Sequence, residues 1–267
     1  MNATAAVLFV GLALATLWLC GGWLLRQPMF SVARIVVQGE LLHTSARSLR
    51  ANVAPQLVGN FLTLDLEAAR HAFEQVPWVR SAQVRREFPG DLRVLLQEHD
   101  VAARWGEGGG MLVNSHGEVF EADDDGLDLE DLPRLQGPAD RAAELLDMAR
   151  RLEPALAPLG SPLDALELSG QGGWRATLDS GALLELGGGT PAQVLERVRR
   201  LTNTLPQVAE AQGRTVAALE SADLRHPSGY ALRLRGVTTV SSDTAARAPA
   251  ARAAARPAPR RAPNKNH

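Results

Sequence analysis

The first 25 residues contain the feature that most constrains this chain. From Ala3 to Leu25 no side chain is charged, and none is Asn, Gln or His. As an α-helix this stretch would be about 34 Å long, enough to cross a hydrocarbon core of about 30 Å. Trp18 and Trp23 stand near its C-terminal end, where indole rings favour the membrane interface. The sequence therefore predicts one membrane-spanning helix, within residues 1–26.

A cleaved signal peptide is the competing interpretation of this stretch. Such a peptide has a basic segment, a short apolar core and a cleavage site flanked by small residues. Residues 2–6 contain no Lys or Arg, and Leu24-Leu25-Arg26 lacks the small residues. Cys20 follows the bulky Leu19, which fits a lipoprotein processing site poorly. We therefore expect an uncleaved anchor.

The direction of insertion stays open on charge alone. No Lys or Arg precedes the apolar stretch, whereas Arg26 and Arg34 follow it, which would place the following domains in the cytoplasm. Large domains, however, cross the membrane largely regardless of flanking charge. Only Met1 and Asn2 precede the stretch, as expected if the true start codon lies further upstream.

Beyond the anchor, the alternation of apolar residues predicts two α+β units and a tail. Residues 27–99 have the order strand, helix, helix, strand, strand, with helix caps at Thr44 or Ser45 and at Thr63 or Asp65. Residues 100–236 predict a mixed β-sheet domain with flanking helices. Its strands are expected at 101–105, 111–113, 118–120, 163–168, 174–178, 182–186, 215–223 and 230–234, and its helices at 139–156 and after Thr190-Pro191. Residues 237–267 are rich in Ala, Pro and Arg and are expected to be disordered.

No sequence pattern in the chain indicates catalysis, a metal or a cofactor. His-Glu-x-x-His and Gly-x-Ser-x-Gly are absent, and the glycine clusters at 108–110 and 187–189 lack the Lys-Ser/Thr of a phosphate-binding loop. The acidic run that starts at Glu121 has Leu132 where a calcium loop needs a glutamate. With 28 basic and 30 acidic residues, nucleic-acid binding is not expected. The sequence predicts a binding module that is not an enzyme, with no small-molecule substrate.

The strand-helix-helix-strand-strand order behind a single anchor resembles a POTRA domain, and the longer pattern resembles the FtsQ/DivIB family of bacterial cell-division proteins. The motifs are short, and it is their order and spacing over residues 3–236 that carry the resemblance. They are Val36–Gly39, Val76–Arg86, Phe88–Leu92, Glu98–Trp105, Asn114–Phe120, Leu132–Leu135 and Ala222–Gly229. Within them, Trp78 is expected to pack under the helices of the first unit.

The resemblance implies an essential scaffold of the division machinery. Such proteins lie in the inner membrane at the division septum, with the N-terminus in the cytoplasm and the folded domains in the periplasm. They link early and late division proteins and help to control septal peptidoglycan synthesis. The resemblance implies that the β domain binds FtsB and FtsL and that the POTRA domain recruits other division proteins.

The last predicted strand, Tyr230–Arg235, suggests how a partner is held. At a sheet edge its free backbone groups would pair with a strand from the partner. The alternation places Tyr230, Leu232 and Leu234 on one face and Arg233 on the other. The resemblance adds a contact with FtsB through the arginine after the preceding strand and an interface turn. The predicted partner-binding residues are Arg225, His226, Ser228, Gly229, Tyr230, Leu232, Arg233 and Leu234.

Three alternatives remain at this stage. In the first alternative, the predicted partner-binding residues only complete the sheet and bind no partner. Gln171, His226 and Leu234 differ from the residues typical of the family, which leaves the individual contacts open. A POTRA-bearing assembly or translocation factor and a periplasmic cell-wall enzyme are the other functions that the sequence allows.

Overall fold

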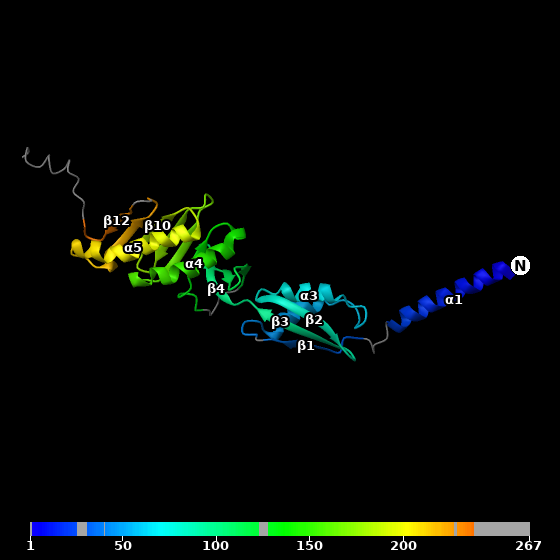
Figure 1. The fold of residues 1–267 in the computed structure, drawn as a ribbon. Helices are drawn as coiled ribbons and strands as arrows, with labels where there is room; N and C mark the ends of the chain where they lie inside the picture. Colours follow the sequence, from blue (N-terminus) through cyan, green and yellow to red (C-terminus); the bar gives the residue numbers. More distant parts are fainter. Residues whose placement is uncertain (1, 26–30, 40, 123–127, 227–228, 238–267) are drawn as a thin grey trace, which may run out of the picture.

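The computed structural model describes residues 2–25, 31–39, 41–122, 128–226 and 229–237. The first element, α1 (Asn2–Leu25), stands apart from the two folded units (Figure 1). Over the residues whose side chains are described, no helix reaches the length and hydropathy of a membrane span. The predicted tail from residue 238 onward lies outside the described residues.

The first folded unit is a three-stranded sheet with two helices on one face. Its sheet has the order β1-β3-β2, with β1 parallel and β2 antiparallel to the central β3. Its elements are β1 (Arg34–Gln38), α2 (Ala46–Val53), η2 (Ala54–Gln56), α3 (Leu66–Glu74), β2 (Val79–Glu87) and β3 (Asp91–Glu98). Ser45 and Asp65 cap the two helices, because each side chain accepts hydrogen bonds from N–H groups of the first turn.

The second unit is built around a nine-stranded mixed sheet with the order β12-β11-β10-β9-β8-β7-β4-β5-β6. Its strands are β4 (Val101–Trp105), β5 (Met111–Asn114), β6 (Val119–Glu121), β7 (Arg134–Gln136), β8 (Leu163–Leu168), β9 (Trp174–Leu178), β10 (Leu183–Gly187), β11 (Leu219–Asp223) and β12 (Ala231–Leu234). Its helices are η3 (Ala139–Arg141), α4 (Ala142–Leu156), η4 (Ala157–Leu159), α5 (Pro191–Ala211) and η5 (Val216–Ala218).

Helices α4 and α5 lie together over one face of this sheet (Figure 1). That face carries a row of apolar residues that are neighbours from strand to strand, because paired residues of adjacent strands point to the same side. The row consists of Leu135, Leu166, Ala176, Leu184, Ala222 and Leu232. The helices therefore bury one face of the sheet and leave the opposite face to polar side chains.

The structure confirms the α+β class, with a POTRA-like unit followed by a large mixed sheet. It corrects the prediction in two places. Residues 134–136 form β7, a strand between β4 and β8 that the sequence pattern did not indicate. The predicted strand at 215–223 is strand only from Leu219, because Val216–Ala218 forms a 3₁₀ turn.

Candidate partner-binding edge and interdomain junction

Strand β12 is the last strand of the nine-stranded sheet. It pairs antiparallel with β11, with Leu232 opposite Ala222 and Arg233 opposite Ser221. In the described part of the chain no strand lies on its other side. The last strand is therefore at an edge, which is the condition that strand addition requires.

The backbone N–H and C=O groups of Leu232 point away from β11, toward the open side of the edge strand. The N–H of Arg235 donates to the carbonyl of Ala218, 2.7 Å away, so it points toward the β11 side. Backbone groups alternate between the two sides of a strand, so those of Arg233 also face β11. The N–H and C=O of Leu232 then point the opposite way, into the open space beside β12. They form a donor and an acceptor to which another strand can bind.

The side chains of this strand alternate as predicted. Leu234 is buried, Leu232 is half-buried, and both pack against the core of the domain. Tyr230, which precedes the strand, packs against the same core, and its hydroxyl hydrogen-bonds the Thr204 hydroxyl on α5. On the opposite face Arg233 is exposed and lies 3.4 Å from a carboxylate oxygen of Glu220. The core thus fixes one face of the edge strand and leaves the other face accessible.

Arg225 follows β11 and forms a two-point ion pair with Asp223. Its Nη2 lies 2.6 Å from one carboxylate oxygen and its Nε 2.9 Å from the other. Hydrogen bonds from the side chain and then the backbone of Arg225 lower the pKa of Asp223 to about 2. Gly187 leaves room for Arg225, because a Cβ at this position would lie 3.0 Å from its Cγ. The guanidinium is therefore held in place and remains exposed.

The other predicted site residues belong to the connection between β11 and β12. His226 is exposed and directly follows Arg225, while Gly229 is half-buried and directly precedes Tyr230. Ser228 lies outside the described residues. The structure thus places the seven described members of the predicted set on β12 and on the segment that connects β11 to it.

The open face of the sheet holds a groove that the sequence analysis did not identify. It encloses about 660 Å³ and reaches from β7 to Arg225, and Gln171 is among its lining residues. Arg175 lies in the groove between two carboxylates, 2.8 Å from Glu185 and 3.3 Å from Glu167. The sequence pattern that could have predicted this groove is the alternation of polar and buried positions in β8, β9 and β10. This row of charges borders the edge where the predicted site residues lie.

A second concentration of aromatic and charged side chains joins the two folded units. Trp78 stacks on His43, with the ring centres 4.0 Å apart, and meets Phe120 edge-on at 5.7 Å. Phe120 in turn stacks on His99 at 4.0 Å. Trp78 is buried with residues of the second unit, so the expectation that it packs under the helices of its own unit is wrong. It is instead a contact between the two units.

Hydrogen bonds close this junction. The guanidinium of Arg80 binds both carboxylate oxygens of Glu118, at 2.8 and 3.1 Å. The fully buried Asn114 donates to Glu118 at 2.6 Å and contacts His99 Nδ1 at 2.9 Å. Hydrogen bonds from Arg80 and then Asn114 lower the pKa of Glu118 to about 2. Burial lowers the pKa of His99, which favours its neutral form.

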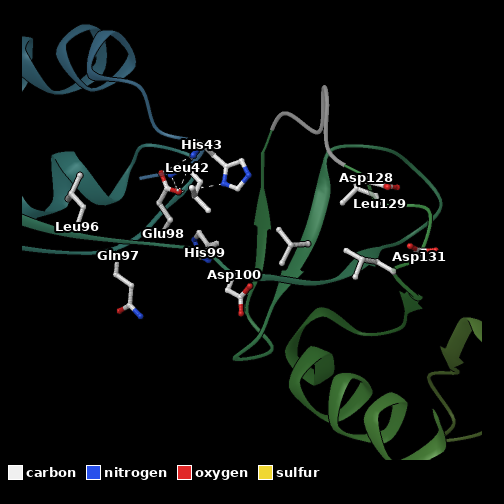
Figure 2. A pocket seen from close by; sticks show the side chains of 12 residues that line it. Leu42, His43, Leu96, Gln97, Glu98, His99, Asp100, Asp128, Leu129 and Asp131 are labelled. Atoms are coloured by element: carbon white, nitrogen blue, oxygen red, sulfur yellow. Dashed lines mark hydrogen bonds and ion pairs between the residues drawn. The ribbon is translucent and has the colours of Figure 1, made fainter. Parts of the chain in front are cut away.

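A cleft lies beside this junction, and Figure 2 shows its lining side chains. It encloses about 630 Å³ between the end of β3 and residues 128–132. Glu98 lines it and accepts N–H groups of Leu42, His43 and Thr44 at 2.8, 3.1 and 2.7 Å. Burial acts to raise the pKa of Glu98, but these hydrogen bonds outweigh it, so the pKa is lowered. Among the described residues no group of three or more His, Cys, Asp or Glu side chains is arranged to hold a metal ion.

Comparisons with known proteins match both units. Residues 30–99 match the FtsQ-type POTRA domain, and residues 103–225 match the C-terminal region of the cell division proteins FtsQ and DivIB. The cell division protein FtsQ of Burkholderia pseudomallei is 37% identical over 238 residues, which cover 89% of this chain and 93% of the relative. The chain belongs to the FtsQ family.

Two further FtsQ proteins are similar over most of their length. That of Thiomonas arsenitoxydans is 35% identical over 240 residues, which cover 89% of this chain and 87% of the relative. That of Nitrosospira multiformis is 35% identical over 238 residues, which cover 87% and 96%. The chain is thus a cell division protein of the FtsQ family with a POTRA domain, as the sequence motifs indicated.

Both sites described above lie at or beyond the ends of the regions that match the FtsQ family. The POTRA match ends at His99 and the second match begins at Ala103, so the junction lies where the two matched regions meet. The second match ends at Arg225, which leaves β12 just beyond it.

Proposed function

We propose that this FtsQ-family protein is a division scaffold that captures a partner strand on β12. In this proposal the second unit binds FtsB and FtsL, and the POTRA unit recruits other division proteins. The assembly links early and late division proteins and helps to control septal peptidoglycan synthesis, and the chain itself is not an enzyme. The observation that carries the proposal is the edge position of β12, with the backbone groups of Leu232 facing outward.

The membrane anchor is part of the same proposal. Helix α1 contains no charged residue from Ala3 to Leu25, and Phe9 and Trp18 are 74% and 79% exposed. Apolar surface of this extent is unfavourable in water and favourable in a bilayer. We propose that α1 spans the inner membrane with its N-terminus in the cytoplasm and the folded units in the periplasm. A phosphatase that is active only in the periplasm, fused after Val237, tests the direction.

Strand addition suits this edge for two reasons. Backbone pairing supplies affinity that does not depend on the exact side chains, so the departures at Gln171, His226 and Leu234 do not prevent it. The exposed cations Arg225 and Arg233 flank the edge and favour an acidic segment of the partner. Both features support capture of a strand with acidic neighbours.

Membership in the FtsQ family favours this function over the two alternatives raised by the sequence. A POTRA-bearing assembly or translocation factor and a periplasmic cell-wall enzyme each lack a specific observation in their favour.

The substitution Leu232→Pro tests the proposal directly. Proline removes the N–H that faces out of the sheet but leaves the hydrogen bonds that Arg233 makes with β11. We expect the variant to remain folded and to lose FtsB and FtsL in co-purification. Leu232→Val is the matched control, because it also shortens the side chain but keeps the N–H. Undiminished recovery of both partners with Leu232→Pro would refute capture by strand addition.

A further inference from the structure

One end of the POTRA unit is formed by three segments that lie next to one another. The turn between β2 and β3 meets the start of β1, where the N–H of Ala33 donates to the carbonyl of Gly90 at 2.9 Å. The loop between α2 and α3 lies at the same end, because Arg86 donates to the carbonyls of Phe61 and Leu64 at 2.6 and 2.5 Å. Figure 1 shows this end facing α1, with the junction at the opposite end of the strands. We call this end the tip, which comprises residues 31–34, 57–64 and 85–91.

The tip exposes apolar side chains that no described part of the chain covers. Phe88 is 82% exposed, Val58 is 79% exposed, and Leu62 is exposed as well. Phe88 stands edge-on to the buried Phe61, with the ring centres 5.5 Å apart, so one edge of its ring is held while most of the ring faces outward. Clustered apolar surface of this kind marks a place of contact with another protein or with a membrane.

The length of the chain restricts what this surface can meet. Leu25 is the last residue of α1, and Ala33 at the tip follows it by eight positions. Eight residues reach about 28 Å at most, even when they are fully extended. The proposed membrane span of α1 therefore keeps the tip close to the bilayer, whereas the junction lies about 30 Å from the tip at the other end of β2. A bilayer surface is thus always within reach of the exposed apolar side chains.

Arginines surround these apolar side chains. Arg85 is exposed and precedes Arg86, whose guanidinium binds backbone carbonyls that leave its charge in place. The acidic residues of the hairpin are each paired with a further arginine, in the ion pairs Glu87–Arg93 and Asp91–Arg34. Asp65, at the end of the neighbouring loop, caps α3 and binds its N–H groups. Arginines beside exposed apolar side chains favour the anionic headgroup region of a bilayer.

We propose that the tip docks on the membrane surface, with Phe88, Val58 and Leu62 among the lipid headgroups and the arginines beside anionic phosphates. This inference rests on the proposed membrane span of α1, which brings the tip to the bilayer. Docking adds a second point of attachment to the one that the helix supplies. Because the tip lies at one end of the strands, the junction and the second unit then project away from the membrane.

Quenching by spin-labelled lipid tests the contact. The full chain is reconstituted in vesicles of phosphatidylcholine and phosphatidylglycerol that contain a lipid with a doxyl group on its acyl chain. Cys20→Ser removes the native thiol, and Val58→Cys or Leu42→Cys then supplies one thiol for a fluorescent label, at the tip or at the junction end. We expect the doxyl lipid to quench the label at position 58 at least about twofold more strongly than the label at position 42.

Two substitutions in the chain labelled at position 58 separate docking from proximity alone. Phe88→Ser should reduce the quenching at least about twofold, because it removes the largest exposed apolar side chain of the tip. Leu42→Ser is the matched control, since it removes an equally exposed apolar side chain at the other end of the unit and should leave the quenching unchanged. Both positions are on the surface, so the unit should remain folded. Equal quenching with and without Phe88→Ser would overturn the proposal.

A charge reversal tests the part assigned to the arginines. Arg85→Glu should reduce the quenching at position 58 in vesicles that contain phosphatidylglycerol, because the anionic headgroups then repel the tip. In vesicles of phosphatidylcholine alone the same substitution should have little effect. A loss of equal size in both kinds of vesicle would overturn the proposed contact with anionic phosphates.

Flotation of the vesicles separates this inference from the proposed anchor. If the chain does not float with the vesicles, α1 is not an anchor, and docking of the tip fails with it. If the chain floats but the labels at positions 58 and 42 are quenched equally, the anchor stands and the docking is overturned. No other protein is present, so a tip that binds a protein partner instead of lipid gives this second result.

Discussion

The junction between the two units and the edge at β12 both contain polar and charged groups, but these groups are paired at the junction and accessible at the edge. At the junction Arg80 and Asn114 both bind the carboxylate of Glu118. Asn114 is fully buried, Arg80 is half-buried and the Glu118 side chain is half exposed. At the edge the backbone groups of Leu232 face open space, and the charged side chains nearby are exposed. Satisfied groups fix the relative position of two parts, whereas unsatisfied groups offer a place for a third. The comparison predicts that stability depends on the junction and partner binding on the edge.

The largest expected effect on stability is at Trp78. Trp78 is 8% exposed and packs between His43 and Phe120, so Trp78→Ala removes a large buried contact between the units. We expect a loss of about 3 kcal/mol in the free energy of unfolding, measured by urea denaturation. Leu42→Ala, at an 86% exposed residue of the neighbouring cleft, is the control and should change it by less than about 0.5 kcal/mol. A loss below about 1 kcal/mol for Trp78→Ala would mean that the junction is not a packed contact.

Acid should weaken the junction next. Arg80 and Asn114 lower the pKa of Glu118 from 4.5 to about 2 in the folded protein. A lowered folded-state pKa contributes stability above the unfolded pKa and loses it as the pH falls toward the folded value. We therefore expect part of the unfolding free energy to disappear between about pH 4.5 and pH 2.

The variant Glu118→Gln isolates this contribution. Its unfolding free energy should fall less steeply with acid than that of the unmodified chain over the same range, as measured by urea denaturation at successive pH values. Because the Glu118 side chain is half exposed, solvent screens the pair and the effect should be smaller than that of Trp78→Ala. Parallel pH profiles for the two chains would exclude Glu118 as a source of acid sensitivity.

The smallest effect on stability is expected at the edge. Arg233 and Glu220 are exposed and 3.4 Å apart, which is the arrangement of a weak surface ion pair. Arg233→Ala should change the free energy of unfolding by less than about 0.5 kcal/mol. The same substitution should slow association with an acidic partner segment, most clearly at low salt. A stability loss comparable to that of Trp78→Ala would remove the contrast between edge and junction.

Local patterns in the sequence predicted much of this fold and part of the site. The alternation of Tyr230, Leu232 and Leu234 gave the correct faces of the last strand, because period-2 burial is a local property. The sequence also predicts a helix cap at Thr44 or Ser45 and another at Thr63 or Asp65, and the structure has Ser45 and Asp65. A cap is likewise a local property, because it depends only on the first turn of its helix. That β12 is an edge strand was open, since it depends on the order in which all nine strands pair.

The contacts that the sequence did not reveal are those between distant segments. Trp78 packs against Phe120, some forty positions away in the chain. The residues next to each of them in the sequence contain no pattern that predicts this contact. Strand β7 has only three residues between Pro133 and Gly137, so its pattern resembles a loop, and pairing with β4 and β8 makes it a strand. The groove around Arg175 depends in the same way on three strands lying side by side.

The strand order also sets a length. Phe120, which touches the POTRA unit, lies in β6 at one end of the sheet, and β12 lies at the other end. Eight inter-strand steps of about 4.8 Å separate these ends by about 38 Å. Because hydrogen-bonded strands resist stretching, the sheet acts as a spacer of fixed size. A partner held on β12 would be kept at that distance from whatever the POTRA unit holds, so deleting a strand from the middle of the sheet would shorten the spacing rather than loosen it.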